Sequence, residues 1–186
     1  MKANRLQLNQ AKTDVLWCAS SRRQHQIPTG PVRVGDALVS PVTAAQDLGV
    51  YIDASITMRT QVINTVTACF AALRQIRSMQ RSLPQHALLT LIQTLVFIKL
   101  DQCNSVLVGT SVCLHGRLQS VLNAAARLVY SRRTSEHTTP LLWELHYLRI
   151  PERIQFRLCV LAYHCVHSTA PAYLSDSLRP TSEIVY

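Results

Sequence analysis

Residues 55–81 read SITMRTQVINTVTACFAALRQIRSMQR, and this stretch decides the fold of the chain. Its apolar side chains recur every three or four residues, which places them along one side of an α-helix. Strands alternate with a period of two, and that pattern ends before residue 55. The chain therefore changes here from strands to helices. The apolar positions are Ile56, Val62, Ile63, Val66, Phe70, Leu73 and Ile76.

The chain after residue 81 keeps the helical periodicity, interrupted by Pro and Gly. Pro84 breaks the first helix and suits the first turn of a second, which is expected to extend towards Val108. Thr139, directly before a proline, predicts the N-cap of a short helix. Further helices are predicted over residues 111–131, 139–147, 150–167 and 171–178.

The first 54 residues carry the patterns of short strands. Apolar residues on both sides of the polar turn NQAKTD (9–14), among them Leu6 and Leu8, indicate a strand entering a sheet. Residues 31–42 predict a β-hairpin that turns at Gly35-Asp36. Residues 46–53 predict one further strand, with its apolar side chains on one face. These side chains are Leu48, Val50 and Ile52.

Together these patterns predict a mainly α fold with a small β part (α+β). A β part over residues 1–54, which includes a hairpin, is followed by a bundle of four or five helices over residues 55–180 and a tail at 181–186. Two or three short strands leave unpaired edges, and small sheets are marginally stable on their own. The helical part is therefore expected to fold better than the β part.

The composition indicates a folded protein with a basic surface. Of the 186 residues, 48% are apolar and only 16% are charged, which argues against disorder. The net charge of +9 is carried by 16 Arg and 3 Lys. Because the planar guanidinium group binds phosphate well, this balance favours a polyanionic partner. Nucleic acid, an acidic protein and an anionic membrane surface all fit that description.

The chain has the features of an intracellular protein. Its six cysteines show neither a CxxC pair nor a regular disulfide spacing, as in a reducing compartment. Residues 1–10 lack the apolar core of a secretory signal. The most apolar segment, 87–100, is interrupted by Gln93 and Lys99 and is too short to span a bilayer. We therefore expect a location in the nucleus or cytoplasm, without a membrane partner.

Five motifs occur in an order that is similar to one known family. In this order and spacing they resemble the C-terminal part of the reverse transcriptase of LINE-type (non-LTR, jockey/CR1-like) retrotransposons. The resemblance extends from about residue 6 to 180. It implies that residues 1–54 are the end of the polymerase palm and that residues 55–180 are a helical thumb. The motifs are LQLNQAKTDVLW (6–17), QDLGVYIDAS (46–55), LQSVLNAAARL (118–128), HTTPLL (137–142) and LRIPERIQF (148–156).

The resemblance also implies roles for particular residues. The family's metal-binding aspartate pair would lie before Met1, so this chain is expected to be inactive as an RNA-directed DNA polymerase. The intact enzyme would need Mg²⁺, whereas no cofactor is expected in this chain. Lys12 matches a palm lysine near the nucleotide phosphates and is the family-derived catalytic candidate. Leu48, Gly49 and Val50 match the primer-grip end of the palm. The ten acidic residues are scattered, which does not favour a two-metal site.

Basic side chains gather on two of the predicted helices. Three arginines fall at i, i+3 and i+7 on the first helix, and three more lie at the end of the third. Such groups bind phosphates without reading bases. They predict sequence-independent contact with an RNA–DNA or DNA duplex, the partner that a thumb would hold. The residues are Arg74, Arg77, Arg81, Arg127, Arg132 and Arg133.

Other functions fit the sequence less well. His164, Cys165 and His167, with Cys159, fit no common zinc spacing, so no metal site is predicted. A small helical module that binds a protein partner or itself through exposed apolar surface is the main alternative. A polymerase completed by another chain is a third hypothesis, and it would require nucleotide incorporation that depends on Lys12.

Overall fold

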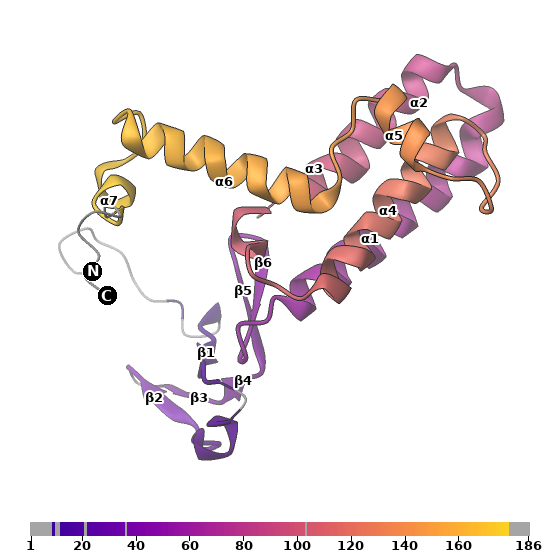
Figure 1. The fold of residues 1–186 in the computed structure, drawn as a ribbon. Helices are drawn as coiled ribbons and strands as arrows, with labels where there is room; N and C mark the ends of the chain where they lie inside the picture. Colours follow the sequence, from indigo (N-terminus) through magenta and orange to yellow (C-terminus); the bar gives the residue numbers. More distant parts are fainter. Residues whose placement is uncertain (1–8, 10–11, 21, 36, 103, 179–186) are drawn as a thin grey trace. The chain divides into compact units, whose positions relative to one another are not determined.

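The structure is a computed structural model that describes residues 9, 12–20, 22–35, 37–102 and 104–178 (Figure 1). It is mainly helical, with small two-stranded sheets in its N-terminal part, and this confirms the predicted fold class. The chain divides into two compact units, Met1–Thr67 and Ala68–Tyr186. The division falls within helix α1 (Arg59–Met79).

Short paired strands are the main regular structure of the first unit. The predicted hairpin is present: β2 and β3 pair antiparallel, with Val32 opposite Val39, and Gly35 at their turn has φ 62°. Strands β1 and β4 pair parallel. Leu6, Leu8 and Asp36, which also entered the strand predictions, lie outside the described residues. The bounds are β1 Val15–Leu16, β2 Val32–Val34, β3 Ala37–Val39 and β4 Pro41–Val42, and a 3₁₀ turn, η3, covers Gln24–Gln26.

Residues 44–53 form a second hairpin, so the prediction of one strand over 46–53 was wrong. Strand β5 (Ala44–Asp47) pairs antiparallel with β6 (Val50–Asp53). Leu48 and Gly49 form the turn between them, with φ 46° and 84°. Positive φ at both central residues is what a type I′ turn requires. Leu48 therefore does not share a strand face with Val50, and its side chain is 93% exposed.

Leu48→Asn is expected to stabilise this hairpin. Leucine is strained at positive φ, whereas Asn followed by Gly is the preferred type I′ pair. We expect the free energy of unfolding to rise by about 0.5–1 kcal/mol, measured by urea denaturation. Leu38→Asn is the matched control, because Leu38 is also exposed but lies in strand β3. An equal gain from both variants would contradict a turn-specific effect.

The Asp53 carboxylate sets the start of α1. Its Oδ1 accepts the backbone N–H of Thr57 at 2.6 Å, and its Oδ2 accepts that of Arg59 at 2.9 Å. The Thr57 hydroxyl donates to the same carboxylate at 2.9 Å. Ile56 has φ 54° within this turn, so the helix begins at Arg59, four residues later than residue 55. Asp53 satisfies N–H groups that a helix N-terminus leaves unpaired.

Asp53→Asn is expected to lower the free energy of unfolding by about 1–2 kcal/mol at neutral pH. Burial tends to raise the pKa of Asp53, but the hydrogen bonds from Thr57, Thr60 and Arg59 outweigh it and hold the pKa below its ordinary value. The charged form thus stabilises the folded state at pH values above the unfolded pKa of about 3.9. This stabilisation is lost as the pH falls through the lower, folded pKa.

Thermal melts of wild type and Asp53→Asn between pH 7 and pH 2.5 test this pH dependence. The difference between the two proteins should be constant above about pH 5 and shrink below about pH 4. A difference that stays constant down to pH 2.5 would show that the Asp53 charge does not stabilise the fold.

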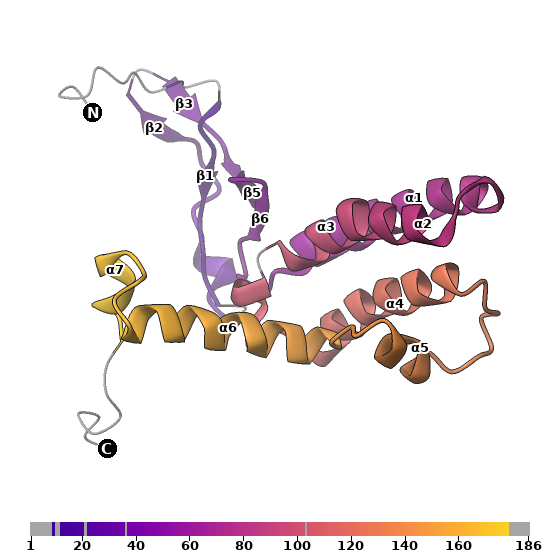
Figure 2. The ribbon, with the colours of Figure 1, turned by 90° about the horizontal axis from the view of Figure 1, so that it is seen from above.

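The second unit consists of helices joined by short turns (Figures 1 and 2). The helices predicted after residue 111 and at residue 150 are confirmed, as is a last turn after residue 171. None of the described helices is both long and apolar enough to span a bilayer. The bounds are η4 Gln80–Ser82, α2 Gln85–Ile92, η5 Gln93–Phe97, α3 Ile98–Asp101, η6 Asn104–Leu107, α4 Val112–Val129, α5 Thr139–Glu144, α6 Ile150–Val166 and α7 Ala172–Ser175.

Two predicted helices end earlier than expected. The helical run after Pro84 ends at Asp101 and not near Val108, and it contains the π-helical turn η5. The N-cap of the short helix is Thr138 and not Thr139, and this helix ends at Glu144, not Tyr147. His146 has φ 54°, and the Tyr147 N–H donates back to a carbonyl of α5 at 2.8 Å. A left-handed residue with such a bond is a common way to end a helix.

The core of the second unit forms where α4 meets α2, α5 and α6 (Figure 2). Leu122 of α4, Ile92 of α2 and Ile150 of α6 are completely shielded from water. The Ile150 N–H donates to Gln119 Oε1 at 2.9 Å, which ties the start of α6 to α4. Burial of apolar surface, at about 25 cal/mol per Å², is the main stabilising contribution here. This core holds α4 in place, and the C-terminal end of α4 forms part of a groove.

Candidate nucleic-acid interface

A groove of about 680 Å³ lies between the C-terminal half of α1, the C-terminal end of α4 and the loop that follows α4. Its floor is apolar, with Leu73 and Leu128 both buried. Its rim is polar and mostly basic. The lining residues are Phe70, Leu73, Arg74, Arg77, Gln80, Ala124, Arg127, Leu128, Ser131, Arg132, Arg133, Thr134 and Ser135.

Five of the six predicted phosphate-binding arginines line this one groove. Arg74 and Arg77 come from α1, Arg127 comes from α4, and Arg132 and Arg133 come from the loop. The lining contains no Asp or Glu. The structure thus brings together, in one unit, arginines of α1 with arginines that lie 50 or more positions later in the sequence.

Arg81 is the predicted arginine that does not line the groove. The helix α1 ends at Met79, and Arg81 lies in the 3₁₀ turn η4. A 3₁₀ turn has three residues per turn, so the spacing that put Arg81 beside Arg74 and Arg77 no longer holds there. The Arg81 side chain is exposed.

Gln80 joins the two helices at the end of the groove, and the sequence analysis missed it. Its Nε2 donates to the Leu128 carbonyl at 2.7 Å and to Ser131 Oγ at 2.8 Å. The first bond goes to a carbonyl in the last turn of α4, which also accepts the Ser131 N–H at 3.3 Å. Gln80 is 48 residues from Leu128 in sequence, and no local pattern marks it as a helix cap.

Glu136 holds the loop from outside the groove lining. Its carbonyl accepts a bond from Arg127 Nη2 at 3.1 Å, and its carboxylate accepts the Arg133 N–H at 3.1 Å. It also lies 3.5 Å from Arg132 in an ion pair that is about half exposed. Such surface pairs are weak and yield readily to another anion. Glu136 therefore orders the loop, and its carboxylate only slightly reduces the positive charge that the loop arginines offer to the groove.

The groove keeps unpaired positive charge. Within the described part of the chain, Arg74, Arg77 and Arg133 form no ion pair. Arg127 is partly buried, and its Nε is shielded from water with no acceptor among the described residues. Arginines that are not neutralised by carboxylates remain available to an anion. The groove is thus suited to phosphate oxygens.

The other family-derived candidates lie in the first unit. Lys12 is exposed, and its N–H donates to the Asn9 carbonyl at 3.0 Å in a tight turn. Leu48 and Gly49 form the tip of the β5–β6 hairpin, and Val50 begins β6. The backbone freedom of Gly49 is used for this turn, with φ 84°. Their roles in nucleotide or primer contact stay predictions.

Cysteine and histidine side chains form no metal site among the described residues. His164 Nδ1 lies 2.7 Å from Thr169 Oγ1, and the His167 ring packs on Tyr163 with 4.1 Å between centroids. Cys165 is buried, whereas Cys159 is exposed. Burial also raises the pKa of the Cys69 thiol to about 11, which leaves it protonated and unreactive at neutral pH.

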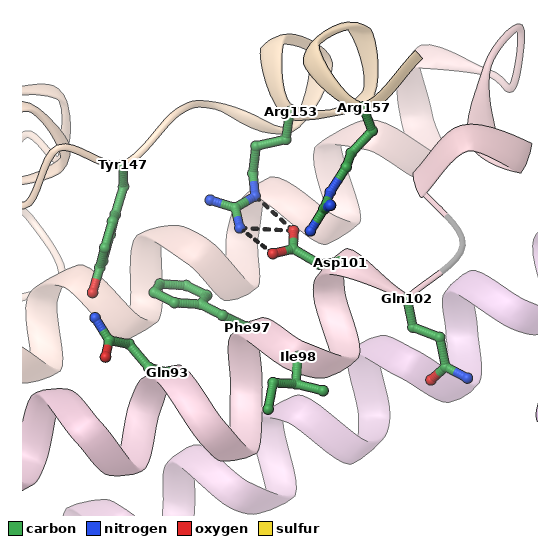
Figure 3. A pocket seen from close by; sticks show the side chains of 8 residues that line it. All are labelled: Gln93, Phe97, Ile98, Asp101, Gln102, Tyr147, Arg153 and Arg157. Atoms are coloured by element: carbon green, nitrogen blue, oxygen red, sulfur yellow. Dashed lines mark hydrogen bonds and ion pairs between the residues drawn. The ribbon is translucent and has the colours of Figure 1, made fainter. Parts of the chain in front are cut away.

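A second hollow, of about 550 Å³, is lined by residues of η5, α3 and α6 and by Tyr147 (Figure 3). At its centre the Arg153 guanidinium donates to the Asp101 carboxylate at 2.6, 2.7 and 2.9 Å. The same guanidinium lies 5.4 Å from the centre of the Phe97 ring. Tyr147 points toward Gln93, and burial raises the pKa of its hydroxyl. One Asp and two Arg line this hollow, so its net positive charge is smaller than that of the groove, and it is a weaker anion site.

Comparisons with known proteins leave the groove as the main guide to function. No model of a protein family matches the chain, and no curated protein or solved structure is significantly similar to it. Function is therefore inferred from charge, geometry and the sequence motifs.

Proposed function

We propose that this chain binds nucleic-acid duplexes without sequence preference through the arginine groove, as a non-catalytic fragment of a LINE-type reverse transcriptase. One observation carries the binding proposal: five arginines from two helices and a loop line one groove that contains no carboxylate. The resemblance of residues 6–180 to the palm end and thumb supports the choice of an RNA–DNA or DNA duplex.

The groove favours contact with phosphates over contact with bases. Guanidinium groups bind phosphate oxygens through paired N–H donors, and such contacts carry no sequence information. Arginine can also bind guanine in the major groove, but reading adenine or cytosine relies mainly on free amide or carboxylate groups, and stacking on bases needs aromatic rings. The one amide in the lining, Gln80, already donates to Leu128 and Ser131, and Phe70 is the one aromatic residue. We therefore expect affinity that depends on charge and not on sequence.

A salt titration of fluorescence anisotropy tests the proposal directly. The purified chain should bind labelled RNA–DNA and DNA duplexes with dissociation constants of about 10⁻⁶ to 10⁻⁴ M at physiological salt. The slope of log K against log salt should be roughly −3 to −4, at ~0.9 for each neutralised phosphate. Two duplexes of different sequence should give the same curve. Binding that persists at high salt, or no binding at 20 mM salt by a cooperatively melting protein, would overturn it.

Polymerisation is not part of the proposal, because the scattered acidic residues of this sequence do not favour a two-metal site. With primer, template, nucleotides and Mg²⁺, the chain is expected to incorporate no nucleotide. Incorporation that is abolished by Lys12→Ala would instead support a polymerase completed by another chain.

Self-association is the second candidate, and helix α6 supports it. Phe156, Tyr163 and Val166 are 56%, 61% and 71% exposed on this helix. Apolar surface gathered in this way marks interfaces or aggregation. Light scattering without nucleic acid would show a concentration-dependent increase in mass, unchanged by substitution of Arg74 and Arg77. A mass that stays at 20.8 kDa would exclude this candidate.

A further inference from the structure

We propose that Ser135 is a phosphorylation site for an arginine-directed serine kinase, and that its phosphate closes the groove to nucleic acid. Phosphorylation of Ser135 requires only that a kinase can reach the loop between α4 and α5. Its effect on binding rests on the function proposed above.

The position of Ser135 suits a kinase substrate. It lies in the non-helical loop between α4 and α5, and its side chain is exposed. Within the described part of the chain its hydroxyl forms no hydrogen bond, so no internal bond competes for it. Kinases bind substrates as extended, accessible segments, and loops provide these more readily than helices. Ser131, in contrast, accepts a bond from Gln80 at 2.8 Å.

The two residues that a kinase would recognise lie just before Ser135. Arg132 and Arg133 stand three and two positions upstream, and both are exposed. A kinase whose substrate cleft is lined by carboxylates would bind them by paired, charge-assisted hydrogen bonds. The ion pair between Arg132 and Glu136 is about half exposed at 3.5 Å, and hydrogen bonds of 3.1 and 3.2 Å close the turn from Arg133 to Glu136. A kinase that binds the loop in an extended form would have to open this turn, whose contacts lie at the surface and are individually weak. Ser131 precedes the two arginines, and Thr134 follows directly after them, so neither has this spacing.

The reaction is a phosphoryl transfer from ATP. The Ser135 Oγ–P bond forms as the bond between the γ-phosphorus and the bridging oxygen of ADP breaks. The hydroxyl proton passes to the catalytic base of the kinase. The product carries about −1.5 to −2 charges at pH 7 and three strong acceptor oxygens.

The phosphate would act on the groove because Ser135 is part of its lining. Arg74, Arg77 and Arg127 line the same groove from the two helices. A phosphate ester held in the loop is an intramolecular ligand for these guanidinium groups, at a high effective concentration. It would occupy the groove that duplex phosphates need and would reduce its net charge by about two. Binding of a duplex should then weaken, and its salt dependence should become less steep.

The test treats the whole chain with a purified arginine-directed serine kinase and Mg-ATP. Tandem mass spectrometry is expected to place one phosphoryl group on Ser135. Ser135→Ala should abolish the modification, and Ser131→Ala, in the same loop, should leave it intact. After phosphorylation, affinity for a labelled DNA duplex at 50 mM salt should fall on the order of tenfold, with a shallower salt slope. Phosphatase treatment should restore the original affinity.

The outcomes separate the two proposals. If Ser135 is not modified while the untreated chain binds the duplex, this inference is wrong and the proposed function stands. If Ser135 is modified but affinity is unchanged, control of the groove is refuted. If the untreated, folded chain binds no duplex, the proposed function fails, and the control of binding fails with it. Mass spectrometry then still decides whether Ser135 is a substrate.

Discussion

Asp101→Asn is expected to lower the free energy of unfolding by about 2–3 kcal/mol, the largest stability loss among the single variants considered. Asp101 accepts three short hydrogen bonds from Arg153 and one from Asn104 Nδ2 at 3.0 Å. The Arg153 and Asp101 side chains are only 17% and 24% exposed. Removing one charge leaves the other poorly solvated, which is more destabilising than loss of an exposed pair. The residual exposure keeps the expected loss below that of a fully buried pair.

Urea denaturation followed by circular dichroism measures this effect. Asp176→Asn is the matched control, because Asp176 is exposed and forms no ion pair with another described residue. It should change stability by less than about 0.5 kcal/mol. Equal stabilities for the Asp101 and Asp176 variants would show that the Arg153 contact does not hold α3 to α6.

The helices could be predicted because each carries its own pattern. The spacing of Val62, Leu73 and Ile76 fixes a buried face of α1, and Val62 and Ile76 are indeed 1% and 0% exposed. Pro84 and Pro151 mark helix starts, although Pro84 is the N-cap of α2 and not, as predicted, part of its first turn. These signals lie within a few residues of the features that they specify.

The predictions were wrong where strand pairing or capping overrides the local sequence pattern. Leu48, Val50 and Ile52 alternate as a strand would, yet the chain reverses at Leu48-Gly49 because β5 and β6 can then pair over four residues each. The gain from this ladder outweighs the strain of Leu48 at φ 46°. Asp53 looked like one of several scattered acids. Its role as the cap of α1 appears only once the turn after β6 brings the N–H groups to it.

Contacts between distant residues could not be read from sequence at all. Arg153 meets Asp101 across 52 positions, and Gln80 meets Ser131 across 51. The sequence predicted two basic helix ends, but it did not predict that they share a groove, since that depends on how α1 packs against α4. Arg81 shows the limit of extrapolating a helical period beyond the end of the helix.

Arg74→Gln with Arg77→Gln is expected to weaken duplex binding by tenfold or more at 50 mM salt. Both arginines line the groove from α1, both are exposed, and neither is paired with a described carboxylate. Loss of two phosphate contacts should reduce the salt slope by about 2, and the loss should be equal for unrelated duplex sequences. Because the substituted side chains lie at the surface, the thermal melt should stay within a few degrees of wild type.

The control for net charge is the pair Arg117→Gln and Arg157→Gln. These arginines are also exposed on helices of the second unit, α4 and α6, but they lie outside the groove lining. A general charge effect would lower affinity equally in both double variants, because each removes two positive charges. A groove that holds the duplex predicts a large loss for the Arg74 and Arg77 pair and less than about a threefold loss for the control pair. Equal losses would mean that the duplex responds to the +9 charge of the chain and not to the groove.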